Sequence, residues 1–110
     1  MAPLNKSLPR TKMTMRSERL RAIGKLLQEN ERVIVTEWRF APSAETGWHR
    51  HVHDYVVVCL TAGKLLAETA SGNVETALQF GQSYARPAGV EHNIVNAGDE
   101  EFAFVEVELK

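Results

Sequence analysis

From residue 32 onward, clusters of turn-forming residues divide this chain into short segments in which apolar and polar side chains alternate. Alternation with a period of two is typical of strands that bury one face, and turn signals at roughly 8–12-residue spacing indicate an all-β sandwich or barrel. The expected strands cover residues 32–40, 48–60, 64–69, 74–78, 83–86, 92–96 and 101–109.

The segment 17–30 has a different pattern. Its apolar residues Leu20, Ile23 and Leu27 have the i, i+3, i+7 spacing of one helix face. Polar residues at both ends of the segment are suited to start and stop a helix. Gly24 would weaken that helix by roughly 1 kcal/mol relative to Ala. We therefore expect a short helix over residues 17–30.

A chain of 110 residues has room for one domain, which buries roughly 60–68% of its unfolded surface. We assign residues 16–110 to this domain and residues 1–15 to a disordered or arm-like start. No apolar run approaches the ~20 residues of a membrane helix. Cys59 is the only cysteine, which excludes an internal disulfide and favours the reducing cytoplasm.

Charge is divided unevenly along the chain. Residues 1–32 carry eight Lys or Arg against three Glu, whereas the rest carries five basic against eleven acidic residues. A basic arm can bind nucleic acid or an anionic membrane, and it also has features of an organellar transit peptide. Pro3, Pro9 and the lack of apolar periodicity before Met13 favour a disordered start instead. We expect no nucleic-acid partner, no membrane partner and no secretory signal peptide.

Three of the four histidines, His49, His51 and His53, fall within five residues, and the fourth is His92. In an unbroken strand the first three would share one face, with neighbours ~6.6 Å apart along the backbone. Two such rings can converge on one ion at a metal–nitrogen distance of ~2.0–2.1 Å. This stretch alone leaves two alternatives open, a metal site and a solvated surface cluster.

Residues 81–96 have the spacing G-x5-P-x-G-x2-H-x3-N, which resembles the second cupin motif at every fixed position. His49 and His51, followed by Gly63, resemble the first cupin motif in part. Ser43 stands in place of its leading glycine, and Tyr55 or Val56 occupies the slot of its usual glutamate. The resemblance covers about residues 33–109. More narrowly, residues 35–40, Val57, Val58 and residues 86–93 resemble the single-domain cupins of β-alanine degradation.

The resemblance implies a small cupin double-stranded β-helix, a jelly-roll-like barrel with a short N-terminal arm. In such chains, residues 17–30 often form an extended edge segment, which is the alternative to the helix. The implied metal ligands are His49, His51 and His92. His53 is an additional candidate if the first strand is unbroken, and Tyr55 is a candidate catalytic or outer-shell residue.

Three imidazoles leave the full charge on a divalent ion, which favours an anionic ligand. Imidazole suits several transition metals, so the sequence does not choose among Fe, Ni, Cu, Zn and Mn. One hypothesis is a metalloenzyme, oxygenase-like or isomerase-like, that acts on a small carboxylate held by Arg39, Tyr84 or Arg86. A metal-dependent dioxygenase is one form of it, and catalysis stays open because a non-catalytic binding or sensor cupin is the alternative.

A sandwich of this size has sheet edges that need cover. An exposed edge strand can pair with another chain, and closed two-fold dimers are the commonest soluble oligomers. Small cupin barrels also resemble one another in pairing through sheet edges or faces. We therefore expect a homodimer.

Overall fold

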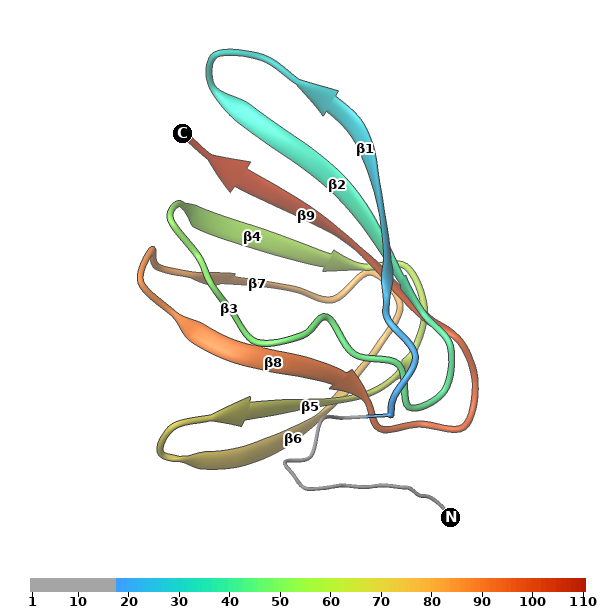
Figure 1. Cartoon of the computed structure of the whole chain (residues 1–110). Coiled ribbons are helices and arrows are strands. Elements are labelled where there is room, and N and C mark those ends of the chain that lie inside the picture. Colours follow the sequence, from blue (N-terminus) through green and yellow to red (C-terminus); the bar gives the residue numbers. More distant parts are fainter. Residues whose placement is uncertain (1–17) are drawn as a thin grey trace.

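The computed structural model describes residues 18–110, which form two β-sheets facing each other (Figure 1). The all-β, jelly-roll-like architecture predicted from the sequence is confirmed, and the expected arm at residues 1–15 lies outside the described residues. No helix occurs within residues 18–110, so none there is long and apolar enough to cross a membrane. The five-stranded sheet has the order β1 (Ile23–Glu29), β2 (Val33–Phe40), β9 (Phe102–Leu109), β4 (Asp54–Cys59) and β7 (Ser83–Arg86). The four-stranded sheet has the order β3 (His49–Arg50), β8 (Glu91–Asn96), β5 (Gly63–Thr69) and β6 (Gly72–Leu78).

Most neighbouring strands are distant in the sequence. β9 lies between β2 and β4, and β8 lies between β3 and β5, all in antiparallel register. The chain therefore crosses repeatedly from one sheet to the other. These crossings bring the histidines of β3 and β8, more than 40 residues apart, into direct cross-strand register.

The core lies between the sheets. Alternate residues of β4 point inward, so Tyr55, Val57 and Cys59 are buried while Val56 and Val58 are only half-buried. Phe40 and Phe104 pack against them, with their ring centroids 5.5 Å apart. This alternation is the pattern that the sequence predicted for half-buried strands.

The helix expected over residues 17–30 is wrong for the described residues 18–30, because they contain no helix and Ile23–Glu29 forms the edge strand β1. The side-chain oxygen of Asn30 accepts hydrogen bonds from the backbone amides of Arg32 and Val33, which closes a β1–β2 hairpin. Gly24 also has a local role, since a Cβ there would lie 2.8 Å from the indole of Trp38. Pairing with β2 outweighs the weak helical spacing of the leucines and isoleucine.

The single strand expected over residues 48–60 is divided in two. β3 joins the four-stranded sheet through β8, whereas β4 joins the five-stranded sheet through β7 and β9. Between β3 and β4, the backbone amide of His51 donates a hydrogen bond to the carbonyl of Val90. The carbonyl of His51 accepts one from the amide of Gly89. The three clustered histidines therefore do not lie on one unbroken strand.

Candidate metal centre

Three histidines converge at one end of the space between the sheets. His49 and His92 are cross-strand partners on β3 and β8, and His51 follows in the turn after β3. The Nε2 atom of His51 lies 3.0 Å from Nε2 of His49 and 3.2 Å from Nε2 of His92. The structure thus brings together the three residues that the sequence predicted as ligands.

The protein fixes which nitrogen of His49 faces the other two rings. Its Nδ1 atom lies 2.8 Å from the carbonyl oxygen of Gly47, which can only accept a hydrogen bond. Nδ1 therefore carries the proton and donates it, which leaves the Nε2 lone pair free. A carbonyl on the outer nitrogen is a common way to orient a histidine that binds metal.

His51 is held by its ring face and by a buried carboxylate. The ring of Tyr55 stacks on it, with centroids 3.9 Å apart and an interplanar angle of 20°. Behind it, Nδ1 of His51 lies 3.9 Å from the carboxylate of Glu106, an electrostatic contact longer than a hydrogen bond. Glu106 also accepts a hydrogen bond from the indole of Trp38 at 3.4 Å.

Sequence reasoning missed Glu106, which is buried on β9. Burial raises its pKa to about 7, and the neighbouring charge of Glu108 acts in the same direction. The only signal in the sequence was a glutamate at an inward position of the last strand, where an apolar residue is usual. Glu106 lies beside Nδ1 of His51, on the opposite side of the ring from the Nε2 atom that faces the other two histidines, so it does not take the place of the missing glutamate ligand.

The trio is suited to bind metal as neutral imidazoles. Burial lowers the pKa of His51 and of His92 to about 4, and the neighbouring His49 adds to the effect. Both rings therefore keep a free lone pair at neutral pH. Ligands at ~2.0–2.1 Å around a tetrahedral ion would be about 3.3 Å apart, close to the observed spacing of the Nε2 atoms. The donor set fits a divalent transition metal.

The other sequence candidates lie elsewhere or play other parts. His53 is outside the trio, since its Nδ1 atom lies 3.3 Å from the carboxylate of Glu108. Tyr55 does face the site, although through its ring rather than as a replacement for the glutamate ligand. Val56 points to the opposite side of β4 from Tyr55.

A cavity of about 390 Å³ adjoins the three histidines. Its deep end is lined by buried apolar side chains, including Val57, Leu65 and Phe104. Tyr84 and Arg86 of β7 also line the cavity. Both are among the residues that the sequence suggested could hold a carboxylate. The other candidate anchor, Arg39, lies outside this cavity and pairs with Glu37 and Glu101.

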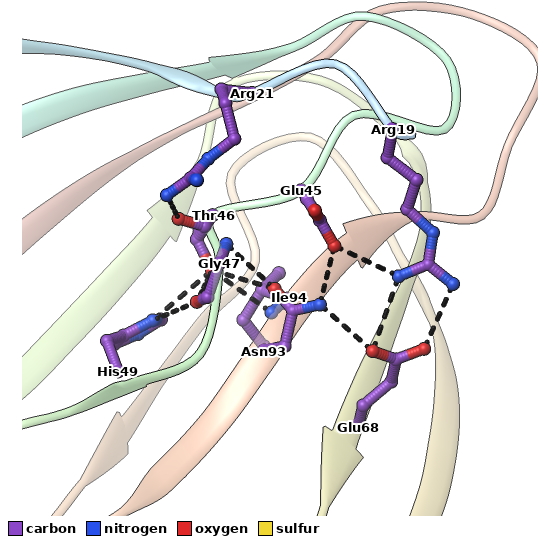
Figure 2. Close-up of polar contacts among 9 residues, drawn as sticks. All are labelled: Arg19, Arg21, Glu45, Thr46, Gly47, His49, Glu68, Asn93 and Ile94. Atoms are coloured by element: carbon purple, nitrogen blue, oxygen red, sulfur yellow. Dashed lines mark hydrogen bonds and ion pairs between the residues drawn. The ribbon is translucent and has the colours of Figure 1, made fainter. Parts of the chain in front are cut away.

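A polar network connects the site to residues just before β1 (Figure 2). The side chain of Asn93 accepts a hydrogen bond from the amide of Gly47 at 2.8 Å and donates to Glu45 and Glu68. Arg19 pairs with both of these glutamates. The loop that carries His49 is therefore fastened on its outer side by a network that the sequence did not predict.

These features define a class of protein: a double-stranded β-helix barrel with a three-histidine site at one end of its cavity. The chain belongs to the cupin family, because residues 36–108 match the model of the Cupin_2 family, described as a cupin domain. It is 57% identical over 94 residues to the Beta-alanine degradation protein BauB of Pseudomonas aeruginosa, covering 86% of this chain and 99% of BauB.

Two solved structures agree with this assignment. The crystal structure of a cupin domain from Bordetella pertussis has a TM-score of 0.83 and 57% identity, covering 86% of this chain and 98% of that one. A protein with a double-stranded β-helix domain from Klebsiella pneumoniae has a TM-score of 0.69 and 25% identity, covering 86% and 81%. The predicted resemblance to small cupins of the BauB type is confirmed.

Proposed function

We propose that this protein is a metal-binding cupin in which His49, His51 and His92 hold one divalent transition metal. The observation that carries the proposal is the convergence of three Nε2 atoms beside a largely apolar cavity. Three histidine ligands with an open position are typical of catalytic rather than structural metal sites. Fe, Ni, Cu, Zn and Mn are the candidate metals, and metal analysis of the isolated protein distinguishes them.

The proposed activity is that of a small metalloenzyme, oxygenase-like or isomerase-like, on a small anionic carboxylate. The name of BauB connects that protein with β-alanine degradation, and we propose a related metabolic role for this chain. A bound metal would supply a Lewis acid or a centre for dioxygen. The protein would supply orientation through the three histidines, a hydroxyl from Tyr55 and an apolar wall that limits water.

The test combines metal analysis with turnover. We expect about one metal per chain, and we expect His51→Ala to lose most of it because His51 contacts both other rings. His53→Ala is the matched control and should keep its metal. Full occupancy in His51→Ala would refute the ligand assignment. Oxygen uptake with a panel of small carboxylates would identify a metal-dependent dioxygenase, and ligand binding without any turnover would favour a sensor.

We also propose that the protein is a homodimer in the cytoplasm. Support for the dimer comes from β1, a sheet edge on which all seven residues are exposed. Support for a reducing compartment comes from Cys59, which is buried and unpaired. Burial raises the pKa of this thiol, which suits a structural rather than a reactive cysteine.

A further inference from the structure

The wall of the cavity beside the histidine trio carries no acidic side chain among residues 18–110. Arg86 is the one Lys or Arg in that part of the lining, and it is exposed at the cavity's mouth. Its guanidinium lies 4.6 Å from the centroid of the Tyr84 ring and donates one hydrogen bond to the carbonyl of Ala85. The ion pairs found within the described residues do not include Arg86. Most of its five N–H donors therefore remain for a ligand.

Arg86 lies close enough to the trio to act on the same ligand. It is the cross-strand partner of Tyr55, whose ring stacks on His51. A carboxylate at the mouth would meet a guanidinium on one side and the histidine site on the other. Guanidinium groups match carboxylates with two parallel hydrogen bonds.

Three carboxylates outside the lining have partners of their own. Glu106 lies behind His51, and Glu68 is bound by Arg19. Asp54 accepts a hydrogen bond from a backbone amide at 2.8 Å. A ligand ammonium that entered this cavity would give up water without gaining an acidic partner, which is costly for a charged group.

The deep end of the cavity suits an uncharged chain. Val57, Leu65, Leu78 and Phe104 line it, and each is at most 5% exposed. The volume of about 390 Å³ is near the lower end of the roughly 300–1,000 Å³ range of small-molecule sites. The space admits a small molecule, and its apolar lining favours an aliphatic body over a polar one such as a sugar.

We propose that the ligand is a small aliphatic carboxylate without an amino group, and that the cavity selects against zwitterionic amino acids. This inference rests on the proposed function. Arg86 holds the carboxylate at the mouth, and the aliphatic part enters the apolar end. Where such a ligand derives from an amino acid, a deamination or transamination must supply it. The protein then acts after nitrogen has been removed.

The test uses the zinc-loaded full-length protein and calorimetric titration at pH 7.5 with four three-carbon probes. The probes are propanoate, 3-hydroxypropanoate, β-alanine and the neutral propanamide. We expect the first two to bind, and β-alanine to bind at least about tenfold more weakly because its ammonium stays unpaired. Propanamide should also bind weakly, because it lacks the negative charge.

Arg86→Gln separates the anchor from the metal site. It should keep its zinc and lose about tenfold or more in affinity for propanoate, and Arg86→Lys should recover part of that loss. Arg39→Gln is the matched control, since Arg39 lies outside the cavity, and it should bind propanoate normally.

The outcomes distinguish this inference from the proposed function. Equal affinity for β-alanine and propanoate would overturn the inference while leaving the metal site intact. Unchanged propanoate binding by Arg86→Gln would overturn the anchor. No uptake of zinc or of any other candidate metal, or no binding of any carboxylate by the metal-loaded protein, would overturn the inference together with the proposed function.

Discussion

The ring and the hydroxyl of Tyr55 have different roles. Its ring stacks on His51 and is buried in the core, whereas its hydroxyl belongs to a side chain that lines the cavity. Burial raises the pKa of this phenol well above its usual range, so the hydroxyl stays protonated at neutral pH. It is therefore available as a hydrogen-bond donor to an anion and not as a phenolate metal ligand.

Replacing Tyr55 tests this division. Tyr55→Phe keeps the stacked ring, so zinc content should stay within error, while the lost hydroxyl should weaken propanoate binding by a few-fold to about tenfold. Tyr55→Ala removes the ring and leaves a cavity, so it should lower stability by about 3–5 kcal/mol and also weaken zinc retention. Metal analysis, calorimetry and thermal unfolding measure the three effects. Equal ligand binding by Tyr55→Phe and wild type would contradict a contact with the hydroxyl.

Buried titratable groups act in opposite directions on the stability of the metal-free protein. The pKa of His51 and His92 is about 4 in the folded state, below the ordinary value of 6.5. The stability that comes from keeping these two rings neutral is fully present above pH 6.5, and it is lost as the pH falls toward 4. The pKa of Glu106 is about 7, above its ordinary 4.5, so its contribution is present below pH 4.5 and is lost as the pH rises through 7. On acidification the two histidines lower the stability and Glu106 raises it, so together the three groups predict a net loss.

Glu106→Gln should change this pH profile with a defined sign. The variant lacks the carboxylate whose ionisation destabilises the folded protein at high pH. Its free energy of unfolding should therefore rise relative to that of wild type by about 1–3 kcal/mol as the pH increases from 4.5 to 8. Denaturant unfolding of the chelator-treated proteins at several pH values measures the difference. Glu108→Gln is the control, since its side chain is 21% exposed against 10% for Glu106 and it should show a smaller effect. A constant difference between Glu106→Gln and wild type across this range would contradict the assignment.

At the scale of elements, the loop before β3 depends on β8. Asn93 is 7% exposed and accepts a hydrogen bond from Gly47, the residue whose carbonyl orients His49. Arg21, beside β1, also donates a hydrogen bond to the carbonyl of Thr46 in this loop (Figure 2), with a donor–acceptor distance of 2.7 Å. The short strand β3 therefore keeps its histidine in place through side chains from other elements.

Asn93→Ala should affect both stability and metal binding. It leaves the amide of Gly47 without its partner, which costs about 1–3 kcal/mol, and it frees the loop that positions His49. Thermal unfolding and zinc titration measure the two effects. Asn30→Ala is a matched control because Asn30 closes the β1–β2 hairpin far from the site. It should lower stability without changing zinc affinity, and an unchanged zinc affinity in Asn93→Ala would limit that network to a structural role.

The sequence predicted the strands where local signals agree with tertiary pairing. Alternation along residues 33–40 and 102–109 and the glycine-containing turns specify most of the barrel, and the second cupin motif pointed to His92. Segment 17–30 could not be predicted in this way, because β2 determines its conformation. Glu106 was missed for a related reason. Its proximity to His51 comes from strands that pair across more than 40 residues, and no spacing in the sequence encodes that contact.

At the scale of the whole molecule, the outer strand β1 carries exposed apolar side chains. β1 is the outer strand of the five-stranded sheet, and all seven of its residues are exposed, including Ile23 at 71% and Leu26 at 58%. Leu20, just before it, is 65% exposed. Apolar side chains on an unpaired sheet edge favour association with another chain. Two copies related by a two-fold axis would each cover the other's patch.

We therefore predict that the protein sediments as a dimer at micromolar concentration and that β1 forms the contact. Ile23→Glu places a charge in this contact, and leaving it buried and unpaired would cost several kcal/mol, enough to shift the protein to a monomer. Phe80→Glu is the matched control, because Phe80 is 76% exposed but lies outside β1, and it should remain a dimer. Sedimentation velocity distinguishes the two species. A monomeric wild type would refute the dimer, and dissociation by Phe80→Glu but not by Ile23→Glu would place the contact away from β1. If the contact is correct, monomeric Ile23→Glu should still bind zinc, because the three histidines all come from one chain.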